Sequence, residues 1–270
     1  MWCVDSAFAR VVAVACLGLT GCTAATASVS GKDALVVGVK ADQPGLGLLE
    51  KGTYRGFEVD VGTHIARRMG AKRVTFRTVT SADRERLLND HSVDLVLASY
   101  SITPDRAKAV TFGGPYYVAH QDIMVRRGEE GIQNVRDLAG RRLCQASGSV
   151  STERVVIGLG IRPRLVPSPS YSECVRKLLG GDVDAVSTGD LVLAGFAARY
   201  RDRVKIVNAP FTDERYGVGL RSGDVDGCEK VNRALTVMYQ DGTAARLLRK
   251  WFGASELSLT TSVPEFEGCS

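Results

Sequence analysis

A long hydrophobic run is missing from this 270-residue sequence. The most apolar stretch, Val11 to Leu19, has roughly half of the ~20 residues that a membrane-spanning helix needs. We therefore expect no permanent transmembrane anchor. Hydrophobic residues nevertheless make up 44% of the chain, which is enough for folded cores.

Histidine is scarce, and the familiar catalytic motifs are missing. The three histidines are scattered, and no two cysteines have the Cys-x-x-Cys spacing of a metal site. No Ser/His/Asp order, His-Glu-x-x-His motif or phosphate-cradling glycine loop is present. We expect neither a metal nor another cofactor, and no enzymatic activity.

The charge lacks a dominant sign and any local concentration. There are 35 basic and 30 acidic residues, a formal net charge of +5, and they are spread along the chain without runs. A nucleic-acid-binding protein usually carries a basic patch interleaved with aromatic residues. Nucleic acid is therefore not an expected partner.

The N-terminal segment has the layout of an export signal. Arg10 precedes the apolar run, and Leu19-Thr20-Gly21-Cys22 follows directly. This tetrapeptide resembles the lipobox of bacterial lipoproteins, so residues 1–22 are interpreted as a signal peptide and Cys22 as the lipidated residue. The alternative is an ordinary signal peptide with an incidental cysteine. Residues 23–32 show no periodicity and are predicted to be a flexible tether.

Four cysteines remain in the exported part of the chain: Cys144, Cys174, Cys228 and Cys269. An even number of cysteines in an exported protein indicates two disulfides. Four cysteines allow three pairings, and the sequence does not choose among them. Proximity along the chain favours Cys144 with Cys174, and Cys228 with Cys269.

Short β-branched runs alternate with amphipathic segments, a pattern typical of mainly parallel sheets flanked by helices. Val61, Ile65 and Met69, for example, recur every four residues in a predicted helix. The pattern occurs twice, which predicts an α/β fold with two lobes and a cleft between them. Two extended segments, Gln121 to Arg126 and Tyr216 to Leu220, are the predicted hinge. Lobe 1 is predicted to comprise residues 33–123 and 219–270, and lobe 2 residues 124–218.

Six stretches, in order and at compatible spacing, resemble the polar amino acid-binding proteins of ABC importers, which form family 3 of the bacterial extracellular solute-binding proteins. They begin at Gly56, Ser101, Gly114, Ser147, Tyr171 and Gly181. Within the family, Asp42 to Gly47 and Gln121 to Val125 most resemble actinobacterial glutamate- and glutamine-binding lipoproteins. The resemblance implies a type II periplasmic-binding-protein-like fold and closure around a polar amino acid. It also implies permease and ATPase partners and a lipid-anchored, monomeric protein on the extracytoplasmic face of the membrane.

The resemblance assigns the ligand's α-carboxylate to Arg106. A guanidinium stays charged and presents two parallel donors to a carboxylate. Ser101 and Thr103 lie in the preceding loop and can add further donors. From lobe 2, the turn containing Gly148 and Ser149 is expected to complete this subsite. The alternatives are a surface arginine in the first turn of a helix and a simple N-terminal cap.

The anchor for the α-ammonium departs from the family pattern. Relatives usually carry an aspartate directly after a Thr-Thr or similar pair, whereas Ser187-Thr188 is followed here by Gly189 and only then by Asp190. Asp190 is expected either to reach the ammonium through a rearranged loop or merely to cap the following helix. An unpaired buried ammonium costs several kcal/mol, so this position bears directly on whether amino acids bind.

Lys40 and Gln43 follow the first predicted strand, near the expected mouth of the cleft. A lysine can pair with a γ-carboxylate, which favours glutamate, followed by glutamine, aspartate and asparagine. Tyr100 is expected either to stack on the ligand's methylene groups or to lie in the core. The alternative for Lys40 is a solvated strand end.

Two other functions remain open at the level of sequence. One is a lipid-anchored sensor that reports its ligand to a membrane receptor or kinase. The other is an enzyme similar to cyclohexadienyl dehydratases, in which Glu58 or Asp60 would be the candidate catalytic carboxylate.

Overall fold

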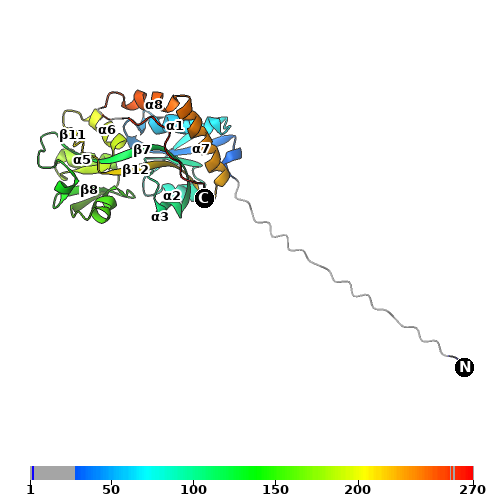
Figure 1. The fold of residues 1–270 in the computed structure, drawn as a ribbon, viewed down its shortest axis with the longest axis horizontal. Coiled ribbons are helices and arrows are strands. Elements are labelled where there is room, and N and C mark those ends of the chain that lie inside the picture. Colours follow the sequence, from blue (N-terminus) through cyan, green and yellow to red (C-terminus); the bar gives the residue numbers. More distant parts are fainter. Residues whose placement is uncertain (1, 3–27, 256, 258, 270) are drawn as a thin grey trace.

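The computed structural model describes residues 2, 28–255, 257 and 259–269. Apart from residue 2, the predicted signal peptide, with the predicted lipidation site Cys22, lies outside these residues. The described chain forms two lobes side by side, with α1, α2, α3 and α7 in one and α5, β8 and β11 in the other (Figure 1). In this part of the chain, no helix is both long and apolar enough to cross a membrane.

Lobe 1 is built on three parallel strands. β1 pairs with β5 on one side and β6 on the other. The elements of this lobe are β1 (Ala34–Val39), α1 (Phe57–Arg68), β5 (Arg73–Thr78), α2 (Arg84–Asn89), β6 (Leu95–Leu97), α3 (Pro104–Ala107), α7 (Val225–Gln240) and α8 (Thr243–Phe252). The fully buried side chains Val37, Val39 and Leu97 line these strands and meet Val61 and Ile65 of α1, as the four-residue repeat predicts.

Lobe 2 repeats the scheme on a smaller scale. Its elements are η2 (Val135–Leu138), β8 (Arg142–Ala146), α4 (Ser151–Glu153), η3 (Arg154–Gly158), β9 (Arg164–Ser168), α5 (Tyr171–Gly180), β10 (Val186–Gly189), α6 (Asp190–Arg199) and β11 (Val204–Ile206). β8 and β9 are parallel. The short helix α4 passes after three residues into the π-helical turn η3. The β-branched Val155, Val156 and Ile157 in that turn are poor helix formers.

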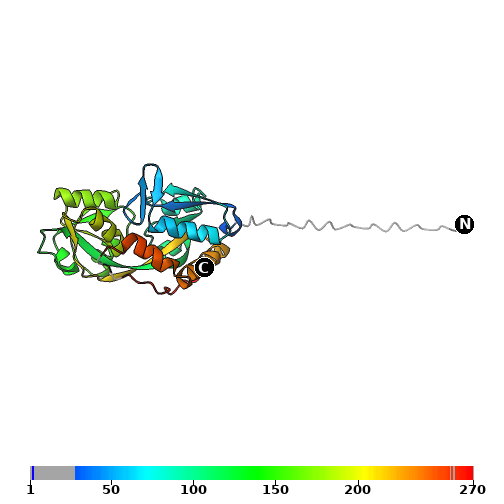
Figure 2. The ribbon, with the colours of Figure 1, turned by 90° about the horizontal axis from the view of Figure 1, so that it is seen from above.

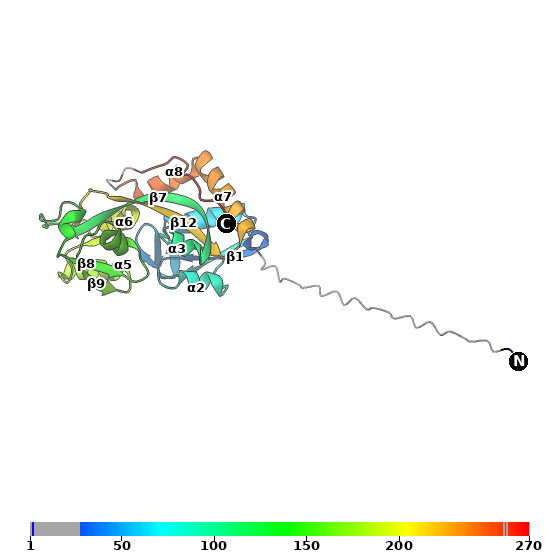
Figure 3. The ribbon, with the colours of Figure 1, turned by 60° about the horizontal axis from the view of Figure 1, so that its bottom comes forward.

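Two long antiparallel strands connect the lobes, β7 (Val110–Arg126) and β12 (Thr212–Arg221). Their register shifts between Tyr216 and Val218, and β7 continues into lobe 2, where it pairs with β10 and β11. Figure 3 shows both strands running from one lobe to the other. The α/β architecture with two crossing strands is therefore confirmed, while the exact hinge residues and lobe boundaries stay a prediction.

A small antiparallel sheet of β2 (Asp42–Gln43), β3 (Gly47–Glu50) and β4 (Thr53–Arg55) was not predicted. Its strands are too short to show a two-residue hydrophobic alternation. In Figure 2 it is the blue hairpin that projects at the border between the lobes.

Part of the predicted tether belongs to lobe 1. Residues 29–31 form a 3-10 turn, and Val29 is buried. The Asp224 carboxylate, at the start of α7, accepts hydrogen bonds from the Ser28 hydroxyl and the Val29 amide. The tether prediction is therefore wrong for residues 28–32, because one buried valine and one capping aspartate bind this segment to the fold.

The disulfides are Cys144–Cys174 and Cys228–Cys269, with Cα–Cα distances of 5.6 and 5.8 Å. The first joins β8 to α5, and the second joins α7 to the C-terminal tail. The pairing favoured by proximity along the chain is confirmed.

Candidate functional site: a cavity between the lobes

A narrow cavity lies where loops of both lobes meet. Its interior is small, with about 10 Å³ accessible to a water-sized sphere. Its lining residues are Ser81, Arg84, Ser99, Ser101, Arg106, Ser149, Val150, Ser151, Tyr171, Thr188 and Glu214. Most of them follow the carboxyl ends of β5, β6, β8 and β10, where ligands bind in open α/β sheets.

Arg106, the residue expected to bind the α-carboxylate, lines this cavity. The Thr103 hydroxyl caps α3 by accepting a hydrogen bond from the Arg106 amide. The guanidinium donates from Nη1 to the Ser101 carbonyl at 2.8 Å and from Nη2 to the Gly148 carbonyl, in the other lobe, at 3.0 Å. Burial and the neighbouring Arg84 lower the pKa of Arg106 to about 10, so it remains charged at neutral pH.

Arg84 is a second buried guanidinium in the same wall, and sequence reasoning missed it. Its side chain is 2% exposed, and its Nη1 donates to the Ala98 carbonyl at 3.2 Å. Its Nε finds no hydrogen-bond partner among the described residues. The signal that could have found it is its place at the first residue of α2, shortly after the carboxyl end of β5, where ligands bind in open α/β sheets.

Tyr100 lies beneath both arginines. Its ring centroid is 3.7 Å from Cζ of Arg84 and 5.2 Å from Cζ of Arg106, distances typical of cation–π contacts. The ring is fully buried, and its hydroxyl donates to Glu85. Tyr100 does not line the cavity; it orients the two guanidinium groups that do.

Lys40 and Gln43 do not line the cavity but form hydrogen bonds with two serines that do. Lys40 Nζ donates to the Ser81 hydroxyl at 2.7 Å, and Gln43 Oε1 accepts from the Ser99 hydroxyl at 3.2 Å. Burial, followed by the charge of Arg84, lowers the pKa of Lys40 to about 7. Lys40 is therefore not the solvated strand end that was the alternative.

The two candidate catalytic carboxylates lie outside the cavity lining. Buried Glu58 accepts hydrogen bonds from the Ser99 amide and the Tyr116 hydroxyl, and burial raises its pKa. Ser99 has a φ of +43°, a conformation rare for a residue with a side chain, and the bond from its amide to Glu58 holds it there. Asp60 accepts from Lys250 and Trp251 of α8. Both carboxylates therefore have structural partners.

The wall from lobe 2 consists of small and hydroxyl-bearing residues. The hydroxyls of Ser149 and Tyr171 lie 2.6 Å apart, and Tyr171 donates to the Ser151 hydroxyl at 3.0 Å. Gly148 has a φ of +71°, and a Cβ there would lie 2.5 Å from the backbone of Ser81 in lobe 1. Only glycine permits this close approach of the lobes.

Glu214, on the crossing strand β12, is the other residue that sequence reasoning missed. Its side chain is 3% exposed; the carboxylate accepts hydrogen bonds from Ser101 at 3.0 Å and from Ser151 at 3.3 Å. Arg154 Nη1 lies 2.5 Å from Glu214 Oε1. Glu214 is the one carboxylate among the residues that line this cavity. It escaped notice because it precedes the segment interpreted as the hinge.

Asp190 does not line the cavity. Its carboxylate accepts from the Leu191 amide at the start of α6, and burial raises its pKa to about 6. At Gly189, an added Cβ would lie 2.0 Å from the Tyr216 hydroxyl oxygen. Of the residues predicted to contact ligand, Ser101, Arg106 and Ser149 line the cavity, while the others support it from behind or lie beside it.

The model of family 3 of the bacterial extracellular solute-binding proteins matches residues 35–254. The chain belongs to this family. The glutamate-binding protein GluB of Corynebacterium glutamicum is 35% identical over 273 residues, which cover 96% of this chain and 92% of that protein. The glutamine-binding protein GlnH of the Bacillus subtilis ABC transporter is 29% identical, covering 83% of each chain.

Solved structures agree with this assignment. An ancestral arginine-binding protein bound to glutamine superposes with a TM-score of 0.75 at 33% identity, covering 82% of this chain and 99% of that one. This family 3 protein is thus a solute-binding protein and not an enzyme, and the dehydratase alternative is set aside.

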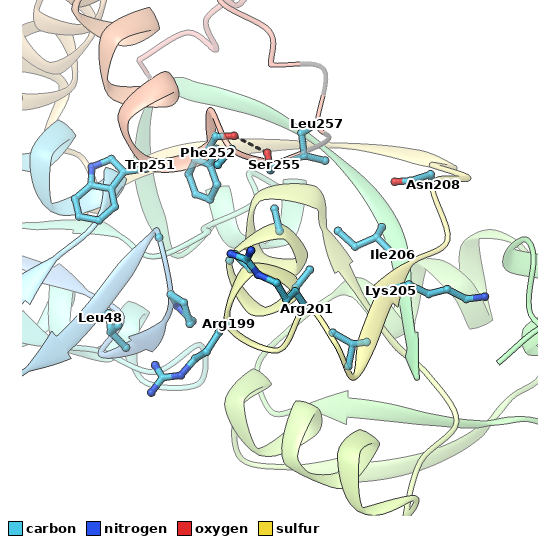
Figure 4. Close-up of a pocket in the computed structure, with 18 of the residues that line it drawn as sticks. Leu48, Arg199, Arg201, Lys205, Ile206, Asn208, Trp251, Phe252, Ser255 and Leu257 are labelled. Carbon is cyan, nitrogen blue, oxygen red and sulfur yellow. Dashed lines mark hydrogen bonds between the residues drawn. The ribbon is translucent and has the colours of Figure 1, made fainter. Parts of the chain in front are cut away.

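This family 3 protein also has a larger and more open hollow, of about 850 Å³, between α6, α8, β11 and the β2–β3 turn (Figure 4). Arg199 and Arg201 lie on its rim, and the side chain of Arg199 is 50% exposed. Exposed charges are screened by water and salt. The buried guanidinium groups of Arg84 and Arg106 line the smaller cavity, which is therefore the candidate ligand site.

Among the described residues, no cluster of three or more histidine, cysteine, aspartate or glutamate side chains is arranged to hold a metal ion.

Proposed function

We propose that this protein captures a polar amino acid, glutamate in preference to glutamine, aspartate or asparagine, and delivers it to an ABC importer. The observation that carries the proposal is the pair of buried guanidiniums, Arg84 and Arg106, in one interlobe cavity. The close relative GluB, a glutamate-binding protein by name, supports the same ligand class.

The charges around the cavity match a dicarboxylic amino acid. Buried charges are stable only when they are paired, and guanidinium pairs bidentately with carboxylate. Two arginines suit the α- and γ-carboxylates of glutamate, with Lys40 adding positive potential from behind Ser81. Glutamine would leave one guanidinium without an anionic partner, so we expect it to bind more weakly.

Capture is proposed to occur by rotation of the lobes about β7 and β12. Two contacts already join the lobes at the mouth of the cleft, Arg106 to the Gly148 carbonyl and the Ser172 hydroxyl to Asp42. Hinge closure around a ligand is the common motion of two-lobed binding proteins.

We further propose that the protein is a monomer on the extracytoplasmic face of the membrane, anchored through lipid on Cys22, and that permease and ATPase subunits are its partners. Membership of an extracellular binding-protein family and two disulfides support an exported protein. Mass spectrometry of the mature N-terminus tests the lipid anchor.

The ligand is tested by isothermal titration of oxidised residues 23–270 with glutamate, glutamine, aspartate, asparagine and arginine. We expect one site, with glutamate binding most tightly. Tighter binding of arginine, or no heat with any of the five from folded protein, would refute the glutamate proposal.

A further inference from the structure

We infer that Glu214 is the residue that binds the ligand's α-ammonium group. This inference rests on the proposed function, because it assumes that the ligand is an amino acid. Glu214 lies on the crossing strand β12, whereas the sequence indicates Asp190 as the candidate for binding the ammonium.

The position of Glu214 fits a buried cation. It lies on β12, between Ser101 of lobe 1 and Ser151 of lobe 2, with its side chain 3% exposed. The backbone of Ser101 also accepts from Arg106, the proposed carboxylate partner. An anion and a cation thus approach the cavity from either side of Ser101, an arrangement that suits the adjacent ammonium and carboxylate of an α-amino acid.

Glu214 has capacity for one more donor. A carboxylate offers about four acceptor sites, and the described contacts from Ser101, Ser151 and Arg154 use three. The contact with Arg154 is an ion pair, in which Nη1 lies 2.5 Å from Oε1 of Glu214.

The other nearby carboxylates have different partners. Asp190 accepts a hydrogen bond from the Leu191 amide and does not line the cavity, and Gly189 has no room for a side chain beside Tyr216. Glu85 accepts from the Tyr100 hydroxyl, and Asp42 from Ser172. An ammonium group in this cavity therefore meets Glu214 as its only anion among the lining residues.

The test compares two ligands and two variants. Glutarate keeps both carboxylates of glutamate but lacks the ammonium. Isothermal titration of the wild type, Glu214→Gln and Asp190→Asn with both ligands separates the ammonium contact from everything else. Asp190→Asn is the matched control, since it neutralises a buried carboxylate that follows the lining residue Thr188 by two positions but does not itself line the cavity.

We expect Glu214→Gln to weaken glutamate binding by about 10- to 100-fold, the usual effect of losing a charge-assisted bond, and to leave glutarate binding unchanged or stronger. Asp190→Asn should change glutamate affinity less than threefold. An equal loss for both ligands would show that Glu214 only positions Ser101 and Arg154, and would overturn the inference. So would a loss confined to Asp190→Asn.

If the wild-type protein binds no amino acid, both the proposed function and the role of Glu214 are refuted. If the wild type binds glutamate, the variants test the role of Glu214 alone. If Glu214→Gln does not fold, a crystal structure of the wild-type glutamate complex decides. An ammonium nitrogen within about 3.2 Å of a Glu214 oxygen supports the inference, and an ammonium bound elsewhere overturns it.

Discussion

Among the arginines that the structure describes, Arg84 and Arg106 are the two that line the interlobe cavity, and both guanidinium groups are buried. Replacing either with glutamine should weaken glutamate binding by about 10- to 100-fold, because a charge-assisted pair is lost from a site with little water. Arg86→Gln is the matched control: it lies on the same helix as Arg84, is 66% exposed and pairs with Asp90. Titration calorimetry checks the three variants. Equal effects of Arg84→Gln and Arg86→Gln would contradict the role of Arg84.

Lys40 makes stability depend on pH. Its pKa is about 7 in the folded protein against an ordinary value of 10.5, so between these values the unfolded chain binds more protons. Stability should therefore rise with pH in this window, by about 1 kcal/mol per pH unit, relative to Lys40→Met. Below pH 7 the difference between the two proteins should be constant.

Urea unfolding of wild type and Lys40→Met at pH 6, 7, 8 and 9 measures this effect. Lys72→Met, at a lysine that is 76% exposed and paired with Asp33, should show no such slope. A difference between wild type and Lys40→Met that stays flat from pH 7 to 9 would show that Lys40 remains protonated.

The sequence predicted individual residues of the cavity better than the contacts between residues that are distant in the chain. Arg106, Ser101 and Ser149 could be predicted because they stand in local motifs. Glu214 could not, since its neighbours Ser101 and Arg154 are distant in sequence and meet it only through the fold. The same holds for Arg84, whose burial depends on Tyr100 and on the loop after β6.

Among the secondary-structure elements, the links with the clearest effect on the free energy of unfolding are the two disulfides. Cys228–Cys269 closes a loop of 41 residues and Cys144–Cys174 a loop of 30. Loop-closure entropy predicts losses of about 4 kcal/mol for each when both cysteines become alanine. We expect the two double variants to lose similar amounts of unfolding free energy.

Denaturation in urea under non-reducing conditions compares the two double variants. A much smaller loss for Cys228→Ala/Cys269→Ala would show that other contacts already hold the tail. Candidates are the Arg215–Glu267 ion pair and the hydrogen bond from the Glu267 amide to the Gly114 carbonyl.

The elements themselves were largely predictable, because amphipathic helices such as α1 and α5 have strong three- to four-residue repeats. The exceptions have physical causes. The strands β2, β3 and β4 are two to four residues long and carry no periodicity. The turn η3 contains the β-branched run Val155 to Ile157, which is a poor helix former.

For the whole molecule, the approach of the two lobes depends on glycine. Gly195, within α6 of lobe 2, faces Pro44 of lobe 1, and a Cβ at this position would lie 1.8 Å from the Pro44 carbonyl oxygen. Gly195→Ala should keep the lobes apart while α6 itself stays helical, since alanine favours helix. We expect glutamate affinity to fall by about 5- to 150-fold, from an overpacking cost of about 1–3 kcal/mol.

Small-angle X-ray scattering with and without glutamate checks this expectation, since the variant should keep a larger radius of gyration than wild type in saturating ligand. Gly180→Ala is the control, because a Cβ at this helical glycine would make only an ordinary van der Waals contact, with Asp182 Oδ2 at 3.7 Å. Wild-type compaction in Gly195→Ala would contradict a closure limited by this contact.

Both ends of the described chain are attached to α7. Val29 is held by Asp224 at its start, and the tail is bonded covalently to Cys228 one turn later (Figure 1). Lobe 2, entered and left through the paired strands β7 and β12, lies away from this point. If the molecule is stretched between its two ends in an optical trap, the load therefore falls on lobe 1. Lobe 2 should remain folded until lobe 1 has given way, producing two rips of unequal length.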